Sequence, residues 1–233
     1  MKKTILCTAL VSALALSSVN AFAHEAGDIL FRAGFTTVAP DDSSTNILVG
    51  GDNFQIGEAV VGGVSVDDNT QLGLNVAYFL SDSWNIEVLA ATPFSHKIDL
   101  ASGGNLGKTK HLPPTITANY FFNHGSAAFQ PYVGLGVNYT IFFDEDFNTT
   151  SAESINGAIG ATISDLSLDN SFGLAAQIGA DYKIADGIFL NASVRYIGLE
   201  TDASFKVNGA DLGSIESVDI NPFVYTISVG YKF

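Results

Sequence analysis

The stretch Phe223-Val-Tyr-Thr-Ile-Ser-Val-Gly-Tyr-Lys-Phe233 ends the 233-residue sequence and alternates strictly between large apolar side chains and small or polar ones. Successive side chains of a strand point to opposite faces, so one face carries Tyr225, Ile227, Val229, Tyr231 and Phe233. A sheet in water hides such an edge, whereas a closed barrel in lipid has no edge and can present an apolar outer face. This ending is typical of a bacterial outer-membrane barrel. Tyr231 and Phe233 are predicted to be its signal to the barrel-assembly machinery.

The beginning of the sequence predicts export. Lys2 and Lys3 precede an apolar stretch, and Ala21-Phe22-Ala23 has the small-x-small pattern of a signal-peptidase site. We therefore expect a cleaved signal peptide at 1–23 and a transmembrane β-barrel domain at 24–233. The only cysteine, Cys7, lies in the leader, so the mature chain has no disulfide.

Charge and hydropathy exclude two classes of protein. Without Lys2 and Lys3, 8 basic residues remain against 24 acidic ones, a formal net charge of −16, which argues against a nucleic-acid partner. No run of about 18 apolar residues follows the leader, so a helical membrane span is not expected. No cofactor is expected, and no His or Cys spacing suggests a zinc site.

The apolar residues alternate instead, in segments long enough to cross a bilayer as tilted strands. Eight such segments can be counted, and an even number suits closure of a bacterial barrel. They lie at about 28–39, 67–80, 84–98, 109–122, 129–143, 171–185, 188–205 and 214–233. The predicted fold class is all-β, an eight-stranded antiparallel transmembrane β-barrel.

The connections alternate between short and long, as periplasmic turns and external loops do. The short ones are 81–83, 123–128 and 186–187, and the long ones are 40–66, 102–105, 144–170 and 208–213. This pattern places both termini in the periplasm. Within the third long loop, 149–168 is apolar enough to form a short helix or a lid over the barrel mouth.

The inward face of the strands carries the candidate lumen residues. These are Leu30, Arg32, Glu87, Asp181, Lys183, Phe189 and Arg195, with Lys232 near the end. An eight-stranded barrel has room only for side chains or one small ligand, so charges of both signs should pair. We predict an ion pair between Asp181 and Arg195. The charged set either forms a rigid polar plug or selects solutes, and a wide diffusive pore is not expected.

Many of the carboxylates fall in the long loops, where they form a solvated surface. They could instead bind divalent cations that bridge to the phosphates of outer-membrane lipid and lipopolysaccharide. Pro113 and Pro114 at the external end of a strand are predicted to interrupt its pairing, because proline cannot donate to the ladder. Such an interruption is where a lateral opening could form.

Catalysis is the weakest hypothesis for this sequence. His96 and His111 flank the same outer loop and could approach Ser95 or Asp99, as in a lipid hydrolase. His24 begins the mature chain and His124 lies in a short turn. Residue type alone does not make an active site, so no enzyme is expected.

Several motifs together resemble the OmpW family. They are His24-Glu-Ala-Gly-Asp28, Arg32-Ala-Gly34, Thr37-Val-Ala-Pro40, Lys110-His-Leu-Pro-Pro-Thr115, Gln130-Pro-Tyr-Val-Gly-Leu-Gly-Val-Asn-Tyr139 and Val229-Gly-Tyr-Lys-Phe233. The resemblance covers essentially the whole mature chain. It implies an eight-stranded barrel with an apolar internal channel that admits small hydrophobic molecules and releases them sideways into the bilayer. It also leaves open a surface interaction protein, a receptor for colicins or phages or an adhesin with a plugged barrel. Neither the residue pattern nor the resemblance specifies the oligomeric state.

Overall fold

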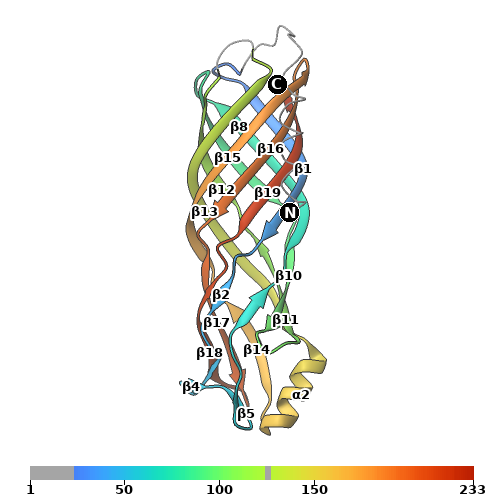
Figure 1. The fold of residues 1–233 in the computed structure, drawn as a ribbon, viewed down its shortest axis with the longest axis vertical. Coiled ribbons are helices and arrows are strands. Elements are labelled where there is room, and N and C mark those ends of the chain that lie inside the picture. The colour runs from blue at the N-terminus through green and yellow to red at the C-terminus, as the bar shows by residue number, and fades with distance from the viewer. Residues whose placement is uncertain (1–23, 124–126) are drawn as a thin grey trace, which may run out of the picture.

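The computed structural model describes residues 24–123 and 127–233, so the predicted leader and His124 lie outside the described residues. Eight strands form a closed antiparallel barrel (Figure 1). In spatial order they are β1 (Ile29–Ala39), β8 (Asn69–Phe79), β9 (Trp84–Ala91), β12 (Thr115–Phe121), β13 (Phe129–Phe147), β15 (Ser171–Ala185), β16 (Ile188–Ile197) and β19 (Phe223–Lys232). Pairing of β19 with β1 and of β12 with β13 completes the circle. The predicted fold class is confirmed.

Alternation sets the two faces of this barrel. The outward side chains form an apolar belt, in which Phe35, Leu135 and Leu174 are each more than 70% exposed. The side chains that alternate with them along each strand point into the barrel, and these are buried and mostly polar. The Trp84 and Tyr120 rings are in tilted contact, with centroids 5.1 Å apart, beside the turn at 81–83, where aromatic rings favour the lipid headgroup level. We call this end of the barrel the short-turn end.

At the opposite, long-loop end, the strands continue beyond the belt as two facing sheets, which we call the extension (bottom of Figure 1). The first sheet holds β7 (Val64–Val66), β10 (Phe94–Leu100), β11 (Asn105–Leu112) and the end of β13. The second holds β14 (Ile163–Leu168), β17 (Glu200–Val207), β18 (Ala210–Asp219), β2 (Ser43–Ser44), β3 (Leu48–Val49) and β4 (Asp52–Asn53). A small hairpin joins β5 (Gln55–Ile56) to β6 (Ala59–Val60).

The loop expected to form a helix or a lid contains both a helix and a strand. Helix α2 spans Thr149–Ile159, and its N-cap Asn148 accepts a hydrogen bond from the Ser151 amide at 3.1 Å. The helix ends at Gly160, whose φ of 67° is a left-handed cap. Ile155 anchors α2 to the apolar core of the extension, and β14 follows. Among the described residues, no helix has the length and apolarity that a membrane span requires.

Candidate functional site

The lumen is closed at the short-turn end by an aromatic plug. Its members are fully buried or nearly so: His24, Leu30, Phe79, Phe121, Tyr132 and Phe189. The His24 imidazole stacks on Phe79 at 4.1 Å and contacts Phe189 at 4.8 Å, and its Nε2 lies 3.3 Å from an Asp181 carboxylate oxygen. Leu30 and Phe189 therefore lie inside the barrel, as predicted, and together with the rings they fill this end.

Next along the axis is a charged layer made of Arg32, Glu87, Gln177, Asp181 and Arg195, each at most 3% exposed. Arg32 donates from Nε and Nη2 to both oxygens of Asp181, at 3.2 and 2.6 Å. Its Nη1 donates to Glu87 at 2.7 Å. Arg195 donates to the other oxygen of Glu87 at 2.8 Å and to Gln177 at 2.6 Å. Two guanidinium groups and two carboxylates thus pair with one another, and Arg195 Nε is the one guanidinium nitrogen of the layer left buried without a hydrogen-bond partner.

The predicted ion pair between Asp181 and Arg195 is wrong. In the hairpin of β15 and β16, Asp181 faces Asn191, whereas Arg195 faces Gln177, which lies four residues before Asp181 in β15. Each charge instead pairs across the lumen, Asp181 with Arg32 and Arg195 with Glu87. Lys183 also lies apart from the layer, because its ammonium pairs at 3.1 Å with Asp186 in the turn.

A ring of hydroxyl and amide side chains separates the charged layer from the long-loop end. Thr36 and Thr226 share a hydrogen bond at 3.1 Å, and Asn138 bonds Thr115 at 3.0 Å and Thr140 at 2.8 Å. These bonds and the charged layer leave no apolar path along the barrel axis through the described residues.

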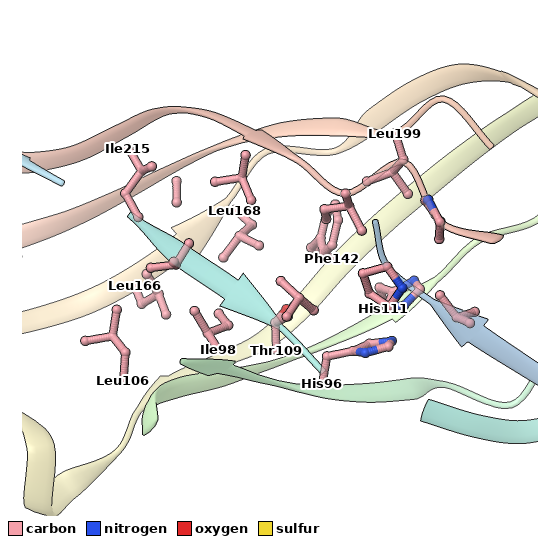
Figure 2. Close-up of a pocket in the computed structure, with 18 residues that line it drawn as sticks. His96, Ile98, Leu106, Thr109, His111, Phe142, Leu166, Leu168, Leu199 and Ile215 are labelled. Atoms are coloured by element: carbon pink, nitrogen blue, oxygen red, sulfur yellow. The ribbon is translucent and has the colours of Figure 1, made fainter. Parts of the chain in front are cut away.

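Between the two sheets of the extension lies an apolar cavity (Figure 2). It is lined by Val38, Pro40, Val64, Val66, His96, Ile98, Leu106, Thr109, His111, Phe142, Leu166, Leu168, Leu199, Ala203, Ile215, Val218, Ile220 and Pro222. About 40 Å³ is open to the centre of a water-sized sphere. One water needs roughly 10–15 Å³ by that measure, so a larger solute must displace lining side chains.

Two buried histidines lie together at one end of this cavity (Figure 2). The His96 and His111 rings stack with centroids 4.9 Å apart, and His111 also stacks on Phe94 at 5.3 Å. Burial, and to a lesser extent the adjacent His96, lowers the pKa of His111 to about 3. Burial also lowers the pKa of His96, against the opposing effect of the Asp67 carbonyl and carboxylate. Both rings are therefore neutral at pH 7.

The ladder between neighbouring strands breaks beside these histidines. Thr115 faces Leu89 and His111 faces Phe94, but the intervening residues 90–93 and 112–114 are in no ladder with each other. On the other side of the prolines the ladder persists, because the Tyr139 amide donates to the Pro114 carbonyl at 3.1 Å. The break in pairing beside Pro113 and Pro114 thus occurs on one side of the strand only, where Pro93 adds a third proline.

The residues proposed for a hydrolase do not assemble into a triad among the described residues. The Nδ1 atom of His96 contacts the Asp67 backbone carbonyl, and Asp99 accepts from Asn105. Sequence reasoning placed both histidines at the right hairpin but missed the cavity they line. The sequence Phe94-Ser-His-Lys-Ile98 could have indicated the cavity, because its alternation places Phe94, His96 and Ile98 on one inward face beyond the belt.

Comparison with known proteins agrees with this architecture. The family model described as OmpW family matches residues 25–233. Outer membrane protein W of Vibrio cholerae is 48% identical over 238 residues, covering all of both chains. The crystal structure of outer membrane protein OprG from Pseudomonas aeruginosa superposes with a TM-score of 0.79 at 40% identity, covering 91% of this chain and 98% of that one. A more distant Pseudomonas aeruginosa relative, named dibenzothiophene metabolism operon protein PahQ, is 29% identical over 207 residues and covers 87% of each chain. The chain therefore belongs to the OmpW family of outer-membrane β-barrel proteins.

Proposed function

We propose that this barrel takes small apolar solutes into the cavity of the extension and passes them sideways into the bilayer. The main support for the proposal is that the extension contains an apolar cavity, whereas side chains fill the lumen of the barrel. A solute that enters between the sheets meets hydrogen-bonded threonines and buried ion pairs along the axis, where an apolar surface would have to replace satisfied polar contacts.

A lateral exit is favoured by the geometry beside the cavity. The unpaired stretch between residues 90–93 and 112–114 lies next to the cavity-lining His111 and at the margin of the apolar belt. The segment 90–93 can move away from the segment 112–114 without breaking ladder hydrogen bonds between them. The proposal places the long-loop end outside the cell and both termini in the periplasm. The printed name of the distant relative, dibenzothiophene metabolism operon protein PahQ, refers to an apolar aromatic compound, which suits this solute class.

Binding is tested with naphthalene and the protein in lipid nanodiscs, by following naphthalene fluorescence. Saturable binding above that of empty nanodiscs is expected, together with no stable ionic conductance in a planar bilayer. Ala203→Leu puts three extra carbons into the cavity and should abolish saturation, whereas Ala210→Leu on the exposed face of β18 should not. Naphthalene uptake that only follows lipid content would contradict the proposal.

Release is tested separately, in bacterial cells expressing the protein. Replacing Pro113 and Pro114 with valine restores two backbone donors and should close the ladder against β9 and β10, slowing naphthalene uptake. The matched control is Pro131→Val, because Pro131 lies inside a fully paired part of β13. Unchanged uptake in the double variant would rule out this exit.

A further inference from the structure

We propose that the cavity selects solutes that carry one hydroxyl group on an otherwise apolar body, and that His96 and His111 bind this hydroxyl. The inference rests on the proposed function and specifies its substrate class as alcohols and phenols.

The two histidines provide the polar atoms of the cavity lining that have no hydrogen-bond partner. Of the 18 lining residues, only His96, Thr109 and His111 carry a polar side chain. The Thr109 hydroxyl already donates to the Lys110 carbonyl at 3.3 Å. The Thr109 oxygen can still accept a hydrogen bond, but the unpartnered polar atoms of the lining belong to the two imidazoles.

Hydrogen bonding fixes the tautomer of one ring. The Nδ1 atom of His96 lies 2.5 Å from the Asp67 carbonyl oxygen, which can only accept, so Nδ1 carries the hydrogen. In the neutral ring Nε2 is then an acceptor. This Nε2 is buried without a hydrogen-bond partner, and so is Nδ1 of His111. Buried polar atoms without partners are few in folded proteins and unfavourable, so a ligand that supplies a partner gains affinity.

The chemistry of the missing partner is a hydroxyl group. Its hydrogen can be donated to His96 Nε2, and its oxygen can accept from the neighbouring His111. A hydrocarbon leaves both nitrogens unpartnered. A carboxylate cannot donate and would bring a charge into an apolar cavity, at a large desolvation cost.

The position of the rings orients the solute. His96 and His111 lie at one end of the cavity, and Leu106 and Ile215 lie toward the other (Figure 2). Contacts with Phe94 at 5.3 Å and Phe142 at 5.8 Å hold the His111 ring. The hydroxyl is thereby directed toward the unpaired stretch beside Pro113 and Pro114, with the apolar body extending toward the outer end.

The test compares 2-naphthol with naphthalene, which share one apolar body, on the same nanodisc-embedded protein. His96→Phe keeps an aromatic ring in the stack and removes both nitrogens. It should weaken 2-naphthol binding about five- to tenfold more than naphthalene binding, the value of one hydrogen bond. His111→Phe should act in the same direction. The control His24→Phe makes the same chemical change in the aromatic plug and should alter neither affinity.

A second measurement needs no variant that must fold. In protein labelled with ¹⁵N-histidine, 2-naphthol should shift the unprotonated nitrogen signal of His96, and naphthalene should not. Equal effects of His96→Phe on both probes, or an unshifted nitrogen signal, would overturn the hydroxyl assignment while leaving apolar binding intact. Failure of both probes to bind the unaltered protein would overturn the proposed function and this inference together.

Discussion

Replacing Glu87 by glutamine should destabilise the barrel by leaving an uncompensated positive charge in the charged layer. Glu87 accepts from Arg32 at 2.7 Å, from Arg195 at 2.8 Å and from Gln177 at 3.3 Å, and it is 1% exposed. Glutamine has the same size but is neutral, and only one of its two terminal atoms accepts hydrogen bonds. The layer would then hold two buried guanidinium groups and one carboxylate.

The size of the loss in the free energy of unfolding depends on which charge is left without a partner. Asp181 stays bound to Arg32 through two hydrogen bonds, so the uncompensated charge falls on Arg195. Removing one partner of a buried pair costs about 3–5 kcal/mol of the free energy of unfolding. That is a large part of the roughly 5–15 kcal/mol that holds a domain folded. Removing the second charge as well, in Glu87→Gln with Arg195→Gln, leaves a neutral pair and should recover at least about 1.5 kcal/mol relative to the sum of the single variants.

The assay is unfolding by guanidinium from phospholipid bilayers, followed by the fluorescence of Trp84, the single tryptophan of the chain. The four proteins of the double-mutant cycle are compared under one lipid composition and at pH 7. A coupling energy near zero, with the single-variant losses simply adding, would refute the view that Glu87 and Arg195 form one buried unit.

Two further predictions concern the extension and the barrel wall. Lowering the pH from 7 to 5 should destabilise the protein through His111. At pH 7 this ring is mostly neutral in both the folded and the unfolded protein. Below about pH 6.5 the ring binds a proton in the unfolded chain but not in the folded protein, where its pKa is about 3. The loss attributable to this ring is about 2 kcal/mol and should be missing from the pH dependence of His111→Phe, whereas an unchanged pH dependence would contradict it. Gly34→Ala should cost about 1–3 kcal/mol, because its new Cβ would lie 2.1 Å from the Ile227 carbonyl oxygen. Gly157→Ala in α2 has open space around it and should instead stabilise by roughly 0.5–1 kcal/mol, and equal effects of the two substitutions on unfolding would argue against the close approach of β1 and β19.

The sequence alone predicts which side chains face the lumen but not which ones touch. Period-2 alternation placed Arg32, Glu87 and Arg195 on the inward face, as observed. Pairing across the lumen joins Glu87 to Arg195, 108 residues away on a strand that is not its neighbour. Alternation carries no information on such contacts, because they depend on strand tilt and on the stagger of the whole barrel.

The error over Asp181 has a more local cause. Asp181 lies five residues before the Asp186-Gly187 turn and Arg195 eight residues after it, and a register shift between Lys183 and Ala185 moves the pairing further. Counting from the turn would have paired Asp181 near Asn191, so this part of the register was within reach of the sequence. The extension was predictable in part, because the segments 84–98, 188–205 and 214–233 run into it, whereas its short strands β2 to β7 lie in a stretch that resembles a loop.

Strand β13 shows why one alternating pattern builds two different interiors. In its first part Leu135 is 73% exposed and outward, while the inward Asn138 and Thr140 are buried and hydrogen-bonded. Beyond Ile141 the pattern inverts: Phe142 is buried inward, and Asp144 is outward and pairs with Lys110. Lipid outside requires an apolar outer face and permits a polar lumen, whereas water outside requires the reverse. The inversion therefore marks the bilayer boundary on β13, at the level where the ladder breaks near Pro114. Under the proposed function, a solute in the apolar interior of the extension would lie directly beside the lipid at that level.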